Sequence, residues 1–347
     1  MLSLIHHIID ISVRRDRSEI NAAMLEAISD LFAPRLVKIY RCYGSRRQTI
    51  VFCCASESAG CRFNRNAYLP DRTYCFPINQ DVLLSRCIKE KSAVMDVLDD
   101  HTHRIVFPVN TQDNPHYLID LVLSDSFSAD QRTALMGLID YFGNHIGLLD
   151  YGETDTLTGL ANRKTFEKHL FELLGQASKD NHDAQGKLRN RRRGTANGSH
   201  WLAVCDIDHF KRINDNHGHL IGDEVLIMLA QTMRDAFRFD DQLFRFGGEE
   251  FVALLQPTDQ TGAFNVLERF RRTVEQQVFS RVGHVTISIG FSHLRANDTP
   301  TDAIDRADEA LYHVKRHGRN QVACHEMLVE EGAISAKETP RGEVELF

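Results

Sequence analysis

The sequence predicts a two-domain protein of α+β and α/β character, in which an antiparallel-sheet domain precedes a domain with a mixed sheet flanked by helices. Three observations predict this class. The chain has 347 residues, which is enough for two domains. The order of expected strands and helices differs between its two halves. Between them lies a stretch of helical periodicity, residues 129–152.

Composition is that of an ordinary globular protein, with 42% hydrophobic and 26% charged residues. The formal net charge of −7 argues against a general nucleic-acid binder, which is usually basic. No stretch approaches the roughly 20 apolar residues of a membrane span. The opening "MLSLIHHIIDISV" is too short for one and lacks the basic start of a signal peptide. We therefore expect a cytoplasmic location, with no nucleic-acid partner and no membrane span.

The cysteines are concentrated near the start of the chain, and none of them forms a CxxC pair. This spacing argues against a zinc site or a thioredoxin-like motif. We expect buried, reduced thiols, and the alternative is a redox or ligand-sensing role. The eight residues are Cys42, Cys53, Cys54, Cys61, Cys75, Cys87, Cys205 and Cys324.

Residues 1–128 are expected to form a small sensor domain. One or two helices end at Pro34, and "LVKIYRCY" and "QTIVFCCAS" then predict paired strands around the turn "GSRR". A less regular segment follows, then a helix in "QDVLLSRCIKEK" and strands in "RIVFPVN" and "HYLIDLVLS". This order resembles that of a GAF domain, which implies a bound signal. The signal is open: a small molecule, a redox change or a protein.

Residues 129–152 are expected to form a helical stalk. Leu135, Phe142 and Leu149 recur every seven residues, and Ile139 and Ile146 form a second row with the same period. Such a row is typical of the seam of a coiled coil between two chains. The alternative is a single helix that packs on its own domain. We expect the inter-chain seam, and with it a homodimer.

Residues 153–325 are expected to form the second domain. The order β-α-β-β-α-β, extended by one α-β unit, predicts a helix-flanked mixed sheet with a hairpin at its centre. Residues 178–200 are nearly free of apolar side chains and are expected to form a loop that interrupts the domain. The acidic tail, residues 326–347, is expected to be disordered.

The segment "RFGGEEF" predicts the tip of that hairpin. Glycine adopts positive φ without strain, so Gly247 and Gly248 are expected at the two central turn positions. The tip then consists of bare backbone that a ligand can approach closely. Glu249 and Glu250 follow and are expected on opposite faces of the next strand. The alternative is a solvated hairpin tip with acidic ends.

A second acidic cluster, "CDIDHF", ends an apolar strand with Asp206 and Asp208. Carboxylates at the end of a buried strand cost free energy unless a partner neutralises them. If the hairpin strand lies beside this one, Glu249 or Glu250 comes next to Asp206. A divalent cation is the natural partner, because Mg²⁺ prefers carboxylates and phosphate oxygens.

Polar residues downstream favour a nucleotide ligand. Asn214, His219 and Asp223 lie around a glycine-containing turn, and an amide with a carboxylate matches the edge of guanine. Lys315 and Arg319 are four residues apart, so on one helix face both would reach the same phosphate group. No Walker A sequence is present. The residue types together predict a nucleoside-triphosphate site.

The second domain is identified by its motifs as a member of the GGDEF family, in the GGEEF form. The motifs run from "DTLTGLANRKTF" through "DIDHFKRINDNHGHLIGDEVL", "RFGGEEF" and "TISIGFS" to "ADEALYHVKRHGRNQV". The resemblance implies a polymerase-palm-like fold and the synthesis of cyclic di-GMP from two GTP, with two pyrophosphates released.

The resemblance also implies a role for individual residues. Two Mg²⁺ or Mn²⁺ ions per active site would be held by Asp206, the Ile207 carbonyl, Glu249 and Glu250, with Glu250 as a ligand of the second ion. Glu249 would take the proton from the 3′-hydroxyl, and Lys211 would stabilise the transition state. The substrate-binding residues would be Asn214, His219, Asp223, Gly247, Gly248, Lys315 and Arg319.

The sequence Arg238-Phe-Asp-Asp241 matches the family's RxxD inhibitory site for the product cyclic di-GMP, and Arg269 on the next helix would add to it. The alternative is an ordinary charge pair at a helix end. For the whole domain, one alternative is a catalytically silent receptor for cyclic di-GMP or GTP. Another is a cyclase that makes an adenine-containing dinucleotide, against which the carboxylate of Asp223 argues.

Overall fold

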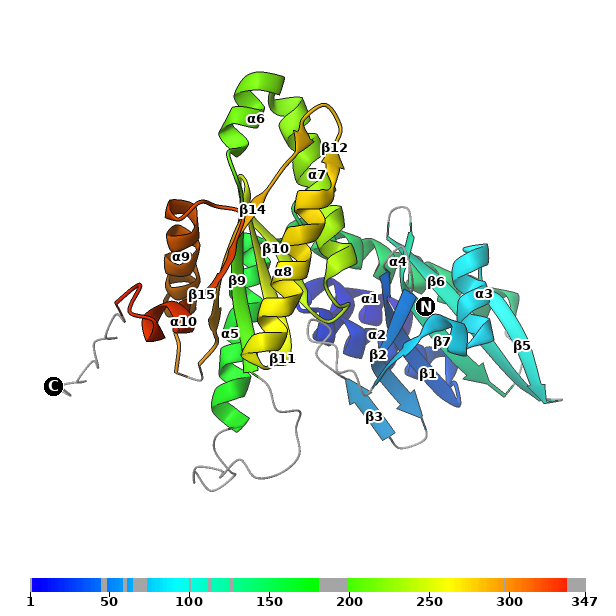
Figure 1. Cartoon of the computed structure of the whole chain (residues 1–347). Helices are drawn as coiled ribbons and strands as arrows, with labels where there is room; N and C mark the ends of the chain where they lie inside the picture. The colour runs from blue at the N-terminus through cyan, green and yellow to red at the C-terminus, as the bar shows by residue number, and fades with distance from the viewer. Residues whose placement is uncertain are drawn as a thin grey trace. The chain divides into compact units, whose positions relative to one another are not determined.

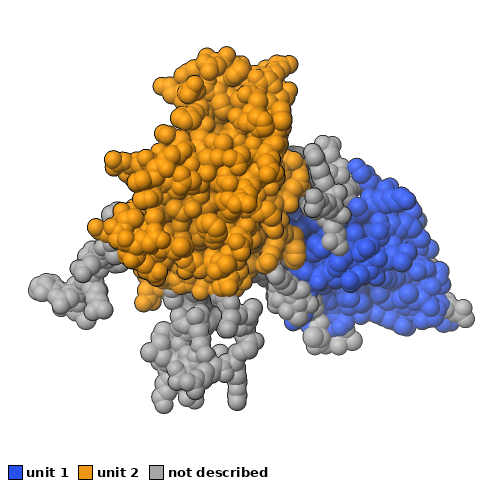
Figure 2. Space-filling model, in the orientation of Figure 1, with its two compact units in different colours: residues 1–154 blue, residues 155–347 orange. Residues whose placement is uncertain are grey.

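The computed structural model of the chain consists of two compact units, residues 1–154 and residues 155–347 (Figures 1 and 2). It describes residues 2–44, 49–58, 61–64, 74–99, 101–111, 114–124, 128–180, 199–295 and 297–335. The boundary between the units falls at the end of the helix that was expected to link two domains.

Unit 1 is built on one antiparallel sheet, as predicted. Its strands follow the order β3-β2-β1-β7-β6-β5, and β4 also pairs with β2. The strands are β1 (Leu36–Gly44), β2 (Thr49–Ser58), β3 (Cys61–Asn64), β4 (Cys75–Pro77), β5 (Val94–Asp99), β6 (Thr102–Thr111) and β7 (Asn114–Leu123). The helices are α1 (Leu2–Val13), α2 (Arg17–Phe32), α3 (Val82–Glu90) and α4 (Ala129–Glu153), with a 3-10 turn η2 (Ile78–Gln80).

Helices cover both faces of this sheet. Side chains of α1, α2 and α4 share one apolar cluster with the strands, and side chains of α3 share another with the opposite face. The helix ends follow from local chemistry. The Asp16 carboxylate caps α2 by accepting from the backbone amides of Ser18 and Glu19. Helix α2 ends where Ala33, just before Pro34, takes a left-handed conformation.

The predicted inter-chain seam on α4 is wrong. Leu135, Phe142 and Ile146 have no exposed surface, and Ile139 is also buried. Leu149 packs against the same cluster in the core of unit 1. The apolar row therefore packs on the sheet of its own domain and is not available to a second chain. This outcome is the alternative that the sequence left open, a single helix that packs on its own domain.

The C-terminal end of α4 is tied to α2 by a buried arginine. Arg17 has 1% of its surface exposed, and its guanidinium donates to Glu153 at 2.7 Å and also pairs with Asp150. The phenol of Tyr117 lies 3.5 Å from the same guanidinium. A buried cation needs such partners because it has lost its hydration. The last turn of α4, which leads into unit 2, is thus held by unit 1.

Strand β5 was not predicted. It lies at the edge of the sheet, and only Val94 among its residues is buried. Each acidic residue of β5 follows two apolar ones, so the strand lacks the period-two alternation that marks a half-buried strand in the sequence.

Unit 2 contains the predicted helix-flanked mixed sheet, in the order β15-β14-β9-β11-β10-β8. The outer pairs β10–β8 and β14–β15 are parallel, and the pairs between them are antiparallel. The strands are β8 (Ala161–Asn162), β9 (Ser199–Ile207), β10 (Gln242–Gly247), β11 (Glu250–Thr258), β14 (Ile287–His293) and β15 (Val322–Cys324). A separate small ribbon pairs β12 (Val278–Phe279) with β13 (Gly283–His284).

Two groups of helices cover the two faces of this sheet (Figure 1). Helices α6 (Phe210–His217), α7 (His219–Ala236) and α8 (Gln260–Gln276) share one apolar cluster with it. Helix α9 (Pro300–Arg316) packs on the other face so closely that a Cβ at Gly290 would meet the backbone of Ala307 and Leu311. Helix α5 (Arg163–Asp180) lies on that face too, where Phe166 contacts Phe244 edge to face.

Two predicted boundaries in unit 2 need correction. The loop expected at 178–200 overlaps the last turn of α5 and the start of β9, and residues 181–198 lie outside the described residues. The tail expected to be disordered from 326 begins with helix α10 (His325–Glu330), because Leu328 and His325 are buried against the domain. Residues 336–347 lie outside the described residues.

No described helix combines the length and the apolar character that crossing a membrane would require. The described cysteines are free thiols. Burial raises the pKa of Cys42 and of Cys87 to about 12, so both thiols are protonated and unreactive near neutral pH. This favours the expected structural role of these cysteines over a redox role.

Candidate functional site

The end of β9 brings acidic residues together as the sequence predicted. Asp206 lies directly opposite Glu250 of β11 and opposite Ser288 of β14. The Asp206 side chain is buried, and its Oδ2 lies 2.7 Å from Nζ of Lys315 on α9. Burial raises the pKa of this carboxyl, and the nearby charge of Asp208 adds to the rise, whereas Lys315 lowers it. Asp206 is therefore an acid whose negative charge the fold does not fully compensate.

The hairpin tip differs from the prediction by one residue. Gly247 pairs with Glu250 across the hairpin, so the two turn residues are Gly248 and Glu249, not the two glycines. A β-bulge between Arg245 and Gly247 causes the shift. Gly248 has a φ of 51°, the left-handed region that favours glycine. Glu249 thus projects from the turn itself rather than from the strand.

The carboxyl of Glu249 is in an acidic environment. Burial raises its pKa, and the charges of Asp206 and Glu250 raise it further, whereas Lys315 lowers it. Another acid, Asp308 of α9, interacts electrostatically with this group of acids. Its pKa is raised first by partial burial and then by the charge of Glu250. The acids of three separate elements therefore converge at one edge of the sheet.

The hairpin tip is anchored by two residues whose roles the sequence did not reveal. Arg245 donates to the carbonyl of Gly248 at 2.8 Å and pairs with the carboxylate of Asp155 at 3.0 Å. Asp155 in turn accepts from the amide and the hydroxyl of Thr158. Asp155 and Arg245 both lie within the motifs quoted above, but only the structure shows that they join the two motifs.

The donor set fits a magnesium or manganese ion that arrives with a phosphate ligand. Asp206, Glu249, Glu250 and the Ile207 carbonyl supply hard oxygen atoms, and burial raises the pKa of the Asp206 carboxyl. In the described part of the chain, no group of three or more His, Cys, Asp or Glu side chains is arranged to hold a metal ion by itself. Mg²⁺ is commonly held by one or two carboxylates plus substrate phosphates, so an open site of this kind suits it.

The predicted base-recognition residues lie on α6 and α7, which are joined by Gly218. Lys211 is exposed in the first turn of α6, and His219 is exposed at the start of α7. Asn214 and Asp223 are both half-buried. The Asn214 amide lies against Gly222, where any Cβ would overlap its Oδ1. Gly222 therefore sets the position of Asn214, a role that the sequence did not reveal.

Lys315 and Arg319 do not share a helix face, contrary to the prediction. Helix α9 ends at Arg316, and Gly318 follows with a φ of 111°. Arg319 lies in the loop beyond, with a φ of 62° and its amide bonded to the Val314 carbonyl at 3.0 Å. Both cations are still near the acids, because each lowers the pKa of Asp206. The glycine thus ends the helix without removing Arg319 from the site.

The predicted inhibitory residues form a separate cluster at the end of α7. The Asp241 carboxylate accepts from the backbone amides of Arg238 and Gln256, both at 3.0 Å. The side chain of Arg238 is exposed. Arg269, exposed on α8, donates to the carbonyl of Ala236 at 2.6 Å. The structure therefore places Arg238 and Arg269 on adjoining surface segments, with Asp241 shaping the turn between α7 and β10.

Comparisons with known proteins agree on the second half of the chain. Residues 153–321 match the family model described as "Diguanylate cyclase, GGDEF domain". The chain is 38% identical over 172 residues to the diguanylate cyclase DgcP of Pseudomonas aeruginosa, covering 49% of this chain and 23% of that protein. It is 39% identical over 170 residues to the diguanylate cyclase DgcM of Escherichia coli K12, covering 46% of this chain and 41% of that protein. The chain thus spans less than half the length of these relatives.

Among solved structures, the chain is similar to the GGDEF domain of DgcB from Caulobacter crescentus in complex with c-di-GMP. The sequence identity is 32%, the TM-score is 0.44, and the match covers 50% of this chain and 94% of that one.

Proposed function

We propose that this chain, whose residues 153–321 belong to the GGDEF family, is a diguanylate cyclase. It would condense two GTP into cyclic di-GMP and release two pyrophosphates. The observation that carries the proposal is the register of Asp206 with Glu250 beside the turn that bears Glu249. Acids from two strands meet there next to a cation, Lys315, which is the composition of a site for a metal-bound triphosphate.

In this proposal Asp206, the Ile207 carbonyl, Glu249 and Glu250 hold Mg²⁺ or Mn²⁺ with the phosphates of GTP. The ion would supply charge neutralisation at the transferring phosphorus and activation of the attacking hydroxyl. Lys315 exchanges its contact with Asp206 for one with the phosphates. Arg319 and the exposed Lys211 bring further positive charge to the same phosphates.

Glu249 is the proposed base that accepts the proton of the 3′-hydroxyl. Its carboxyl lies in the turn beside Glu250, which is in register with Asp206. Asn214 and Asp223 read the guanine edge, because a carboxylate accepts from the ring N–H and the amino group of guanine. The same carboxylate would face the lone pair of adenine N1, which disfavours an adenine substrate.

Two copies of the chain are required for one product. Each second unit offers one nucleotide site, and both phosphodiester bonds need the 3′-hydroxyl of one GTP in line with the α-phosphate of the other. We therefore keep the homodimer as a proposal. The apolar row of α4 is buried in unit 1, so other surfaces would join the two chains.

Unit 1 is the proposed sensor, with GAF-like element order as its support. The chain would also be inhibited by its product through Arg238, Asp241 and Arg269. Two exposed arginines on adjoining segments suit the phosphates of a cyclic dinucleotide. The second candidate function is a silent receptor that binds GTP or cyclic di-GMP without turnover.

Identification of the product by mass tests the proposal. The purified full chain is incubated with Mg²⁺ and GTP, and in parallel with ATP. The proposal predicts cyclic di-GMP and two pyrophosphates per product from GTP, and no cyclic product from ATP. If the chain binds GTP but leaves it intact, the receptor function is supported and the cyclase function is not. A cyclic product from ATP would overturn the assignment of guanine specificity.

A further inference from the structure

The loop after α9 has an unusual backbone. Three consecutive residues, Gly318, Arg319 and Asn320, have φ values of 111°, 62° and 47°. Glycine adopts such values freely, but a residue with a side chain is strained there unless its surroundings hold it. Arg319 and Asn320 both carry side chains, so contacts around this loop must fix its conformation.

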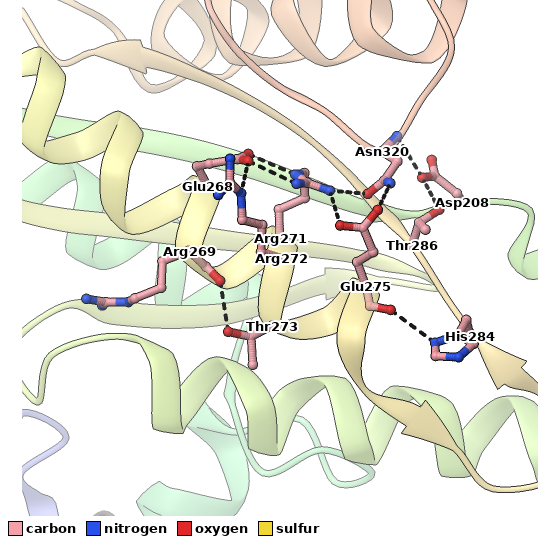
Figure 3. Close-up of polar contacts among 10 residues, drawn as sticks. All are labelled: Asp208, Glu268, Arg269, Arg271, Arg272, Thr273, Glu275, His284, Thr286 and Asn320. Carbon is pink, nitrogen blue, oxygen red and sulfur yellow. Dashed lines mark hydrogen bonds and ion pairs between the residues drawn. The ribbon is translucent and has the colours of Figure 1, made fainter.

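Asn320 makes three hydrogen bonds that fix it, and they lead to two other elements (Figure 3). Its backbone amide donates to Oδ2 of Asp208 at 3.0 Å. Its side-chain oxygen accepts from Nη1 of Arg271 at 2.6 Å, and its side-chain amide donates to Glu275 at 2.7 Å. Asn320 thus bonds to the end of β9 on one side and to α8 on the other.

The partners of Asn320 are themselves held in place. Asp208 is buried and also accepts from the hydroxyls of Thr286 and Ser288, both at 2.7 Å. Arg271 is buried and is fixed by a two-point contact with Glu268 at 2.8 and 2.9 Å. Every polar group at the centre of this network has a partner, so its geometry is rigid.

We infer that the Asp208–Asn320–Arg271 network positions Arg319 for the phosphates of GTP. Asn320 follows Arg319 directly, and Asp208 lies two residues after Asp206, in the turn directly after β9. The network therefore ties the proposed phosphate-binding arginine to the strand that carries the proposed metal ligand. Asn320 acts as a positioning residue, because its bonds determine where the backbone of Arg319 lies before the nucleotide binds.

This inference rests on the proposed function and specifies how the phosphate side of the site is built. It predicts that loss of the Asn320 side chain weakens binding of a triphosphate more than binding of a nucleoside. A purely structural role would weaken both equally or lower stability alone. It also predicts that the effect disappears once Arg319 itself is removed, because the network then has no phosphate contact to position.

The test is a double-mutant cycle of Asn320→Gly and Arg319→Ala in the full chain. Glycine keeps the left-handed backbone without strain and removes both side-chain bonds. The probes are guanosine and 3′-deoxy-GTP with Mg²⁺, which lacks the attacking hydroxyl and cannot be turned over. We expect Asn320→Gly to weaken 3′-deoxy-GTP binding roughly 10-fold, the scale on which orienting partners act. Guanosine binding should be unchanged. In the Arg319→Ala background, Asn320→Gly should cause no further loss of 3′-deoxy-GTP binding.

Arg272→Ala is the matched control. Arg272 lies next to Arg271 on α8 and contacts Glu268 from the exposed face, but it has no contact with Asn320 among the described interactions. It should bind both probes as the wild type does. If Asn320→Gly does not fold, Arg271→Lys replaces it, since it keeps the charge beside Glu268 and loses the planar donor to Asn320.

The inference is overturned if Asn320→Gly weakens guanosine as much as 3′-deoxy-GTP, or if its effect adds fully to that of Arg319→Ala. Failure of the proposed cyclase gives a different result. In that case the wild type binds 3′-deoxy-GTP but makes no cyclic di-GMP from GTP, and the binding cycle still decides whether Asn320 positions Arg319.

Discussion

Two carboxylates at the end of β9 are equally buried and very differently satisfied. Asp206 and Asp208 each expose 5% of their surface. Asp208 accepts hydrogen bonds from Thr286, Ser288 and Asn320. The side chain of Asp206 makes one ion pair in the described structure, with Lys315, and burial raises its pKa.

We interpret the difference as separating Asp208, which maintains the fold, from Asp206, which is proposed to bind a ligand. A buried carboxylate with three donors stabilises its surroundings, and a buried carboxylate short of donors lowers stability until a cation or ligand compensates it. Function is expected where a buried polar group lacks its full set of hydrogen-bond or charge partners. Substitutions at each of these carboxylates and around them test whether the two roles are separate.

The largest effect is expected for Glu249→Gln. Glutamine retains the size of the side chain but cannot accept the proton of the 3′-hydroxyl or bind a cation as a carboxylate does. Formation of cyclic di-GMP should fall by roughly 10³-fold or more, since the proposed metal ligand and the proposed base are lost together. The free energy of unfolding should be nearly unchanged, because Glu249 lies in a turn. The measurement pairs initial rates with chemical denaturation.

The structural role of the fully hydrogen-bonded carboxylate is tested by Asp208→Asn. The amide group of the new side chain is a donor. It would face groups that donate to the Asp208 carboxylate in the wild type. We expect the free energy of unfolding to fall by about 2–4 kcal/mol, the cost of an unsatisfied buried polar group together with a broken network. Asp235→Asn, on the exposed face of α7, is the control. A loss in Asp208→Asn no larger than the control's would contradict the structural role.

A smaller effect is expected for Gly222→Ala, which extends the comparison to the base-recognition side. The added methyl would overlap Oδ1 of Asn214 and displace that amide. The KM for GTP should rise about 10-fold, as for loss of one oriented polar contact, with a smaller change in kcat. Ala230→Gly, in the apolar core of the same helix, would lower stability without a selective change in KM.

The smallest effect on the initial rate is expected for Arg238→Ala. Its exposed side chain lies away from the acids, so the first turnovers should match the wild type. As cyclic di-GMP accumulates, the variant should remain active while the wild type slows. Progress curves with added product measure the difference. Equal slowing of both proteins would refute an inhibitory role for this arginine.

The sequence was most informative where chemistry and local pattern coincide. The strand that ends in Asp206 and the hairpin that bears Glu250 could be paired in advance, because both are apolar strands that end in acids. The exact turn could not, since the bulge near Arg245 shifts the register by one residue. The loop of Arg319 was missed because helical spacing was continued past Gly318, which ends the helix.

The α4 row shows a deeper limit of sequence reasoning. Apolar residues at Leu135, Phe142 and Leu149 repeat every seven residues whether a helix packs on another chain or on its own sheet. Two heptads do not distinguish an inter-chain seam from packing on the helix's own sheet. The two differ in what surrounds the helix, and the helix sequence does not contain that information. Likewise, the contact between Arg245 and Asp155 joins residues 90 positions apart, so no local sequence pattern predicts it.

The most direct test of the central claim is a paired measurement on Asp206→Asn. The thermal midpoint and the rate of cyclic di-GMP formation are determined on the same preparation, beside wild type and Asp208→Asn. We expect a midpoint within a few degrees of wild type, because the loss of the Lys315 pair is offset by removal of a disfavoured charge. We expect product formation to be lowered by roughly 10³-fold. Turnover within a few fold of wild type, or destabilisation as large as that of Asp208→Asn, would contradict the central claim.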